Sequence, residues 1–142
     1  MGQSQLDINA NPSAREIELL KDRIDTFNIG ETKISDFKEI AIFVRDSASE
    51  YVAGIYAYTW GGCLDIRFVW VREDLRGAGL GSKLMQAVEH EAMNRGCHVA
   101  TLETHSFQAP RFYQKLGYEE FGVLDAYPIG HKKHYMRKML QR

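Results

Sequence analysis

The stretch of sequence that decides the fold lies between residues 69 and 82 and reads VWVREDLRGAGLGS. Its first residues are apolar and β-branched or aromatic, as in a buried strand, and a polar connection follows them. Three glycines then stand at alternate positions, Gly77, Gly79 and Gly81. An apolar stripe of helical period begins at Leu80, so the segment predicts a strand, a tight glycine-rich turn and a helix in succession.

A turn of this kind is suited to binding an anion. The free N–H groups of the first helical turn point at the bound group, and the helix dipole favours a negative charge there by about 0.3–1 kcal/mol. Arg76 adds a cation at the same place, which makes a pyrophosphate the natural ligand. The alternative is a glycine-rich turn that only starts a helix, and Arg76 together with the preceding strand disfavours it.

Two common nucleotide-binding patterns do not fit this turn. The triphosphate loop requires Lys followed by Ser or Thr after its last glycine, whereas here Ser82 precedes Lys83. The dinucleotide pattern requires two residues between its second and third glycines, whereas only Leu80 separates Gly79 from Gly81. Neither a triphosphate loop nor a dinucleotide fingerprint is therefore expected here.

The segments on the N-terminal side of the turn predict an antiparallel meander. Residues 40–44, 51–60 and 63–71 each show strand-like composition or alternation, and short polar or glycine-rich turns separate them. In the third strand, strict alternation places four large apolar side chains on one face: Leu64, Ile66, Phe68 and Trp70. A further helix is expected before the meander, because Ser13 and Glu16 fit a capping box, and Asn28 with Gly30 marks its end.

On the C-terminal side of the turn, helix and strand signals alternate. Residues 80–95 carry one apolar stripe that ends at Gly96. Outside the stripe we expect a solvated face made of Lys83, Gln86, Glu89 and Glu91. A strand over residues 98–104 follows, and a right-handed crossover makes it parallel to residues 63–71. A short helix over residues 109–116 and strands over about 118–124 and 134–140 complete the prediction.

The composition is ordinary for a globular protein. The chain has 142 residues, 44% hydrophobic and 26% charged, and its 18 basic and 19 acidic side chains leave a net charge of −1. A near-neutral chain argues against a nucleic-acid-binding protein, which usually shows a basic excess. Because no transmembrane run and no signal-peptide pattern is found, we expect a cytoplasmic protein without a membrane partner. Cys63 and Cys97 are expected to be free thiols.

Two motifs carry a family resemblance. Residues 76–81, RGAGLG, resemble the Gln/Arg-x-x-Gly-x-Gly/Ala signature of the GNAT N-acetyltransferase superfamily, which binds acetyl-coenzyme A. Residues 106–118, SFQAPRFYQKLGY, are similar to the later motif of the same family, an Ala followed by Phe-Tyr and then by Lys-Leu-Gly and an aromatic residue. The motifs stand in the family's order, and the resemblance covers about residues 38–140.

The resemblance implies an α/β fold of the α+β type. The expected sheet is mixed and mostly antiparallel, with six to seven strands flanked by about four helices. Residues 1–142 would form a single acetyltransferase domain. The parallel strands 63–71 and 98–104 are expected to splay apart, so that the pantetheine arm of the cofactor pairs with backbone near Val69 and Val71.

The resemblance also implies roles for individual residues. Tyr113 matches the tyrosine that protonates the departing thiolate. The remaining contacts to coenzyme A are expected from Val69, Val71, Arg76, Gly77, Ala78, Gly79, Leu80, Gly81, Ser82, Ser106 and Lys115. Ser106 departs from the family pattern, because an Asn usually stands at that position and orients the cofactor. No metal is expected, since His131 and His134 lack the further ligands that a metal site requires.

The chemistry of the transfer agrees with a tyrosine acid. A thiol with a pKa near 8.5 is a fair leaving group, and a phenol with a pKa near 10 can deliver a proton to it. The acceptor amine must lose a proton, and Asp65, Glu103 and His105 are candidates beside ordered water, so that no base is named. Tyr127 and His131, in the loop before the last strand, are candidates for contact with the acceptor.

The sequence thus predicts an enzyme that transfers an acetyl group from acetyl-coenzyme A directly to a primary amine of a small molecule or peptide. The alternative is a non-catalytic protein that binds and senses acyl-coenzyme A. A nucleic-acid-binding module is disfavoured by the net charge of −1. The acceptor is left open among small amines, amino-sugar antibiotics, polyamines and peptide amines, and a homodimer is compatible with the resemblance alone.

Overall fold

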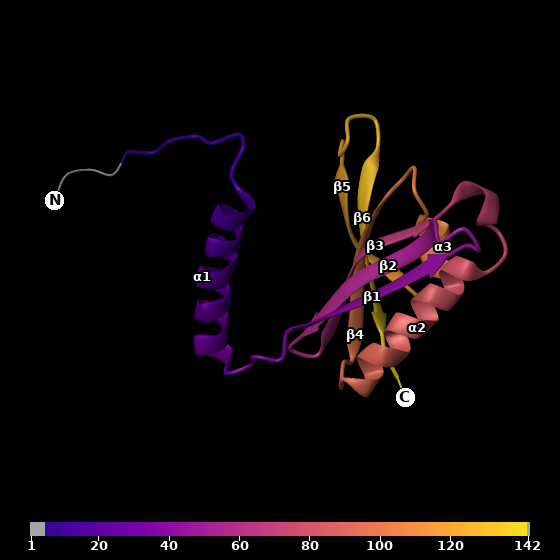
Figure 1. Ribbon diagram of the computed structural model, residues 1–142, viewed down its shortest axis with the longest axis horizontal. Helices are drawn as coiled ribbons and strands as arrows, with labels where there is room; N and C mark the ends of the chain where they lie inside the picture. The colour runs from indigo at the N-terminus through magenta and orange to yellow at the C-terminus, as the bar shows by residue number, and fades with distance from the viewer. Residues whose placement is uncertain (1–4, 142) are drawn as a thin grey trace. The chain divides into compact units, whose positions relative to one another are not determined.

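A computed structural model describes residues 5–141. The chain divides into two compact units, with the boundary between Ser35 and Asp36. The first unit contains one helix, α1, and the second contains the sheet and the remaining helices (Figure 1).

The helix of the first unit, α1 (Ala14–Thr32), begins at the predicted capping box. The Ser13 hydroxyl accepts from the Glu16 N–H at 3.1 Å, and the Ser13 N–H donates to the Glu16 carboxylate at 2.9 Å. The helix continues past the predicted end at Gly30, because Lys33 supplies the left-handed C-cap and donates its N–H to the Ile29 carbonyl at 2.7 Å. Neither α1 nor any other helix within residues 5–141 is long and apolar enough to cross a membrane.

The second unit is built on one mixed sheet. Its strands are β1 (Lys38–Arg45), β2 (Tyr51–Trp60), β3 (Cys63–Val71), β4 (Val99–His105), β5 (Glu119–Asp125) and β6 (Lys132–Met139). They lie in the order β1-β2-β3-β4-β6-β5, and only the β3–β4 pair is parallel. The mixed, mostly antiparallel sheet and the three-strand meander are therefore confirmed.

The numbers of helices and strands are at the lower end of the prediction or below it. Residues 5–141 form six strands, and the seventh strand allowed by the prediction is not found. The same residues form three α-helices instead of about four: α1, α2 (Leu80–Asn94) and α3 (Pro110–Lys115). A short 3₁₀-helix, η1 (Glu73–Leu75), occupies the polar connection between β3 and the glycine turn.

The core of the second unit lies between α2 and one face of the sheet. The apolar stripe of α2 buries Met85, Val88 and Ala92 completely, and these side chains belong to one cluster with Leu64 and Met136 of the sheet. Helix α2 connects β3 to the parallel strand β4 and contacts β2 and β3, as a crossover helix does (Figure 1).

The predicted face of β3 is wrong in its second half. Leu64 and Ile66 are buried, but Phe68 is 68% exposed and Trp70 48% exposed. The cause is a β-bulge: Ala57 of β2 lies opposite Ile66, and Tyr56 lies opposite Phe68, so Arg67 has no partner. One extra residue reverses the alternation, and Val69 and Val71 pack against the core instead.

The parallel pair β3–β4 splays apart as expected. Pairing runs only from Cys63 and Val99 to Ile66 and Leu102. Beyond these residues, β3 continues to Val71 and β4 to His105 without pairing to each other. A gap therefore opens in the middle of the sheet, between residues 67–71 and residues 103–105.

Candidate active site

The glycine turn leaves the start of α2 without a side-chain cap. Gly77 and Gly79 have φ angles of +86° and +85°, in the left-handed region that a side chain would strain. Gly79 is the N-cap of α2, and within residues 5–141 no side-chain cap of this helix is found. The N–H groups of the first turn include those of Leu80, Gly81 and Ser82, and uncapped N–H groups at a helix start are suited to an anion.

The sequence indicated that Gly81 belongs to an anion-binding turn, whereas the structure shows that glycine is needed there for packing against α3. A Cβ atom at this position would lie 3.2 Å from Cζ of Phe112 on α3, whereas one at Gly77 or Gly79 would meet nothing within 4 Å. The missing side chain therefore allows α3 to pack against the first turn of α2. Gly81 places the helix that carries Tyr113 beside the glycine turn.

Arg76 lies between the turn and the end of β3. Its Nε donates to the Val71 carbonyl at 2.8 Å, which folds the guanidinium back along the strand. The Arg72 N–H donates to the Val52 carbonyl of β2 at 2.8 Å. Because backbone groups alternate along a strand, the N–H and C=O groups of Val69 and Val71 point to the other edge, into the gap. The Val71 carbonyl accepts from Arg76, whereas the backbone groups of Val69 lie beyond the β3–β4 pairing, which ends at Ile66.

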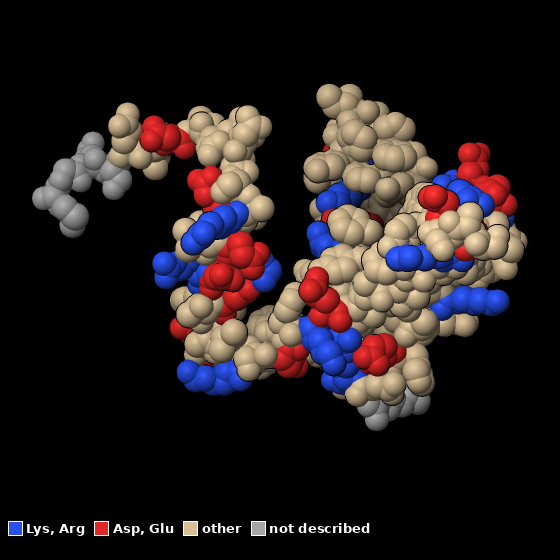
Figure 2. All heavy atoms as spheres, viewed as in Figure 1, with Lys and Arg blue, Asp and Glu red and all other residues tan. Residues whose placement is uncertain are grey.

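The charges around the turn are local and balanced. Arg72 is paired with Asp74 at 2.6 Å and with Asp46 at 3.6 Å. Basic and acidic side chains also lie next to each other on the face of the second unit that Figure 2 shows. On this face, therefore, the charges alternate in sign and do not form a broad basic surface.

Tyr113 lies on α3 with its ring partly buried. The ring makes edge-to-face contacts with Phe112 and Tyr118, at centroid distances of 5.0 Å and 6.1 Å. Burial raises the pKa of the Tyr113 phenol, which keeps the group protonated at neutral pH. Within the described part of the chain, no hydrogen bond of this hydroxyl is found, so its proton is available for a bound group.

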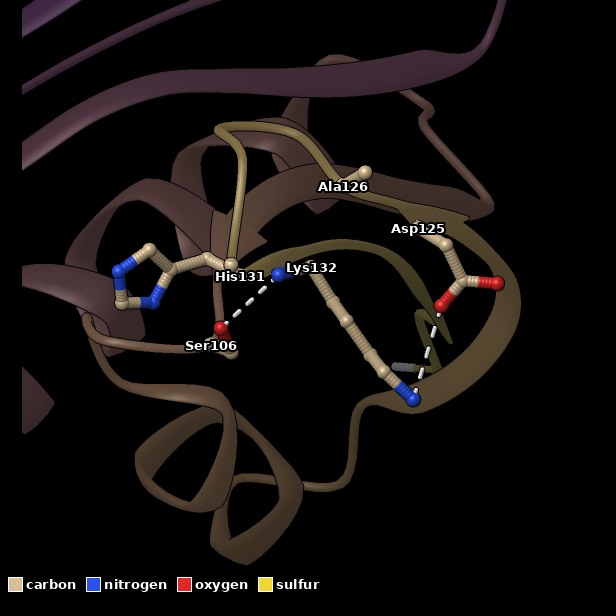
Figure 3. A pocket seen from close by; sticks show the side chains of 6 residues that line it. Ser106, Asp125, Ala126, His131 and Lys132 are labelled. Carbon is tan, nitrogen blue, oxygen red and sulfur yellow. Dashed lines mark hydrogen bonds and ion pairs between the residues drawn. The ribbon is translucent and has the colours of Figure 1, made fainter.

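Ser106 connects two loops. Its N–H donates to the Lys132 carbonyl at 2.8 Å, and its hydroxyl accepts from the Lys132 N–H at 3.0 Å (Figure 3). The two bonds fasten the β4–α3 turn to the β5–β6 loop beside a cavity of about 360 Å³. The cavity is lined by Ser106, Asp125, Ala126, Gly130, His131 and Lys132. Of the remaining predicted cofactor residues, Ala78 lies in the glycine turn, Ser82 in the first turn of α2 and Lys115 at the exposed end of α3.

The three candidate bases lie on the splayed strands, and each has a partner. Asp65 accepts from the Tyr58 hydroxyl at 2.9 Å, and Glu103 is paired with Lys133 at 2.7 Å. Nδ1 of His105 lies 3.1 Å from the Tyr127 carbonyl. A carbonyl oxygen only accepts, so Nδ1 carries a proton in this contact.

An aromatic cluster, formed by His105, Phe107, Tyr127 and His131, covers the end of β4. The His105 ring is stacked with Phe107 and Tyr127 at interplanar angles of 4° and 14°, and His131 contacts Phe107 edge to face. Tyr127 and His131, the two predicted acceptor contacts, therefore lie on one cluster. Phe107 was not predicted, because only the folded loop brings it to His105. No group of His, Cys, Asp or Glu among the described residues could hold a metal ion.

The prediction that Glu89 belongs to a solvated face of α2 is wrong. Glu89 is only 7% exposed, and its carboxylate accepts from the Tyr118 hydroxyl at 2.9 Å and from Lys138 Nζ at 2.6 Å. The helical period of the sequence predicts only that Glu89 lies outside the apolar stripe. It cannot show which side chains distant in the sequence form hydrogen bonds with Glu89.

Comparison with known proteins identifies the class of enzyme. Residues 10–118 match the model of the acetyltransferase (GNAT) family. The glycine turn, the splayed strands and the placement of Tyr113 agree with this match. The chain belongs to the GNAT family and is an acyltransferase.

Individual relatives support the same class. Acetyltransferase Atu2258 of Agrobacterium fabrum is 28% identical over 119 residues, which cover 84% of this chain and 87% of the relative. The blasticidin-S acetyltransferase of Streptomyces morookaense is 35% identical over 101 residues, covering 70% and 74% of the two chains. The crystal structure of an acetyltransferase from Bacillus cereus is 31% identical, covers 94% of this chain and 98% of its own, and superposes with a TM-score of 0.80.

Proposed function

We propose that the chain transfers an acetyl group from acetyl-coenzyme A directly to a primary amine of a small molecule. The observation that carries the proposal is the placement of Tyr113, on a helix packed against the glycine turn and with a partly buried, protonated phenol. The relative named as a blasticidin-S acetyltransferase supports a small-molecule acceptor.

The residues present fit coenzyme A. The uncapped N–H groups of the turn and of the first residues of α2, with Arg76, would hold the pyrophosphate. The backbone of Val69 would pair with the pantetheine arm in the gap. The thioester would then lie between the splayed ends of β3 and β4.

In the transfer step, the amine nitrogen attacks the thioester carbonyl and the C–N bond forms. The Val69 N–H, which points into the gap, would donate to the oxyanion of the tetrahedral intermediate. As the C–S bond breaks, Tyr113 donates its proton to the sulfur, and the proton lost by the nitrogen passes to a base or to water.

The test is a thiol-release assay with acetyl-coenzyme A and a panel of amines, run on the wild-type chain and on Tyr113→Phe. Amine-dependent thiol release together with a stoichiometric acetylated amine supports the proposal. Binding of coenzyme A without release for any amine would contradict it and would favour a protein that only senses the acyl-coenzyme.

A further inference from the structure

Glu89 is the one charged side chain that residues 5–141 bury. It lies on α2, the helix that begins at the glycine turn. A buried carboxylate requires hydrogen-bonded partners, and Glu89 uses its two oxygens for two different ones. Oε1 accepts from Lys138 on β6, and Oε2 accepts from Tyr118, just beyond α3. Burial, and then the charge of Glu89, raise the pKa of Tyr118, so its hydroxyl stays a donor.

Both partners of Glu89 contact the end of α3. The Tyr118 N–H donates to the Tyr113 carbonyl at 3.0 Å, and the Tyr118 ring packs edge to face on Tyr113. On the other side, the stem of Lys138 passes beneath Gly117, where a Cβ atom would lie 3.4 Å from Lys138 Cε. A single carboxylate on α2 therefore fixes both sides of the turn that follows Tyr113.

Helix α3 depends on such contacts. It has six residues, too few for a helix to be stable alone, and its N-cap, Ala109, provides no side-chain hydrogen bond. Its N-terminal half is held by Phe112 against Gly81. The C-terminal half, which carries Tyr113, is held through Tyr118.

We infer that Glu89 is a positioning residue that acts through Tyr118 to hold the Tyr113 ring, and with it the hydroxyl, in place on α3. The inference rests on the proposed function, in which Tyr113 donates the proton to the leaving sulfur. An apolar side chain of similar size would serve stability as well as a buried ion pair does. It would not supply the directed bond that fixes the Tyr118 ring against Tyr113.

The decisive variant is Tyr118→Phe, which keeps the ring and removes only the hydrogen bond to Glu89. We expect kcat to fall about tenfold, because a small displacement of a reacting group is costly, while KM for acetyl-coenzyme A changes by less than about twofold. Glu89→Gln should show the same split between kcat and KM. Rates are normalised to the concentration of sites that bind coenzyme A, so that unfolded protein does not count.

Arg95→Gln is the matched control. Arg95, the C-cap of α2, also fastens the helix to the sheet, by donating to the Thr59 hydroxyl and the Lys38 carbonyl, both at 3.0 Å. We expect this variant to lower the melting temperature with an unchanged kcat. A loss of kcat equal to that of Tyr118→Phe would overturn the inference, because any loosening of α2 would then suffice.

A double-mutant cycle separates the inference from the proposed function. If Glu89 and Tyr118 act through Tyr113, Tyr118→Phe causes no further loss in a Tyr113→Phe background. An equal loss in both backgrounds overturns the positioning role and leaves the acid role of Tyr113 intact. Full turnover by Tyr113→Phe alone refutes the acid role, and the positioning role falls with it.

Discussion

Replacing Gly81 with alanine should show whether glycine in the turn serves the packing of α3 on α2 as well as anion binding. The new Cβ would lie 3.2 Å from Phe112 Cζ, whereas ordinary carbon contacts are about 3.5–4.0 Å, so α3 must move by about 0.3–0.8 Å. Crowding of this size costs about 1 kcal/mol, and alanine in a helix gains up to about 1 kcal/mol over glycine. The two effects nearly cancel in the free energy of unfolding.

The turnover number kcat should fall all the same, because the gain in helix propensity does not move Tyr113 back. Phe112 precedes Tyr113, so a displaced α3 also displaces the Tyr113 phenol. Because a misplacement of about 1 Å can cost 100-fold in rate, we expect kcat to fall about 3- to 30-fold. The melting temperature should stay within about 4 °C of the wild type. Thermal unfolding and steady-state thiol release measure the two quantities.

Gly79→Ala is the comparison variant. A Cβ there meets nothing within 4 Å, but the φ angle of +85° costs a side chain about 1–2 kcal/mol. We expect a lower melting temperature and a higher KM for acetyl-coenzyme A, with a smaller change in kcat. If Gly81→Ala keeps full kcat, or if both variants lose kcat equally, the packing of α3 on α2 does not position Tyr113.

Three further predictions concern the same site. Tyr113→Phe should lower kcat about 100-fold or more in thiol release, as expected for removal of a general acid, and unchanged turnover would exclude that role. Arg76→Gln should raise KM for acetyl-coenzyme A about tenfold with little change in kcat, and a fall in kcat alone would argue against a phosphate contact. Burial raises the pKa of Tyr113, so the phenol keeps its proton to higher pH than a free phenol with a pKa of about 10. The alkaline loss of kcat due to Tyr113 should therefore lie above pH 10, and a loss that Tyr113→Phe abolishes but that lies below pH 10 would contradict the burial effect.

The parts of the site that lie close together in the sequence could be predicted from it. The glycine turn, Arg76 and the start of α2 form one continuous segment, and local turn and helix signals identify it. The meander β1-β2-β3 followed from strand and turn signals, and the splayed parallel pair followed from the family resemblance. The insertion of β6 between β4 and β5 was not predicted. Tyr113 was found by its motif, and its burial and contacts needed the structure.

The parts that depend on distant contacts could not be predicted. The bulge at Arg67 leaves no local signal, because alternation continues on both sides of the extra residue and only the register with β2 reveals it. Glu89 meets Tyr118 and Lys138, which are 29 and 49 residues away along the chain. A charged residue on a helix is usually solvated, so only the packing of α2 on β6 and α3 shows that this one is buried.

The short pairing of β3 with β4 also divides the sheet into two three-stranded halves. The half β1-β2-β3 and the half β4-β6-β5 pair as strands only between residues 63–66 and residues 99–102, and the His98 N–H donates to the Gly62 carbonyl at 2.9 Å just before this pairing begins. An extended ligand in the gap would act as a removable seventh strand that bridges the halves. Ligand binding could then be detected without measuring turnover. It should slow amide hydrogen exchange on both β3 and β4, and it should raise the melting temperature of the whole sheet.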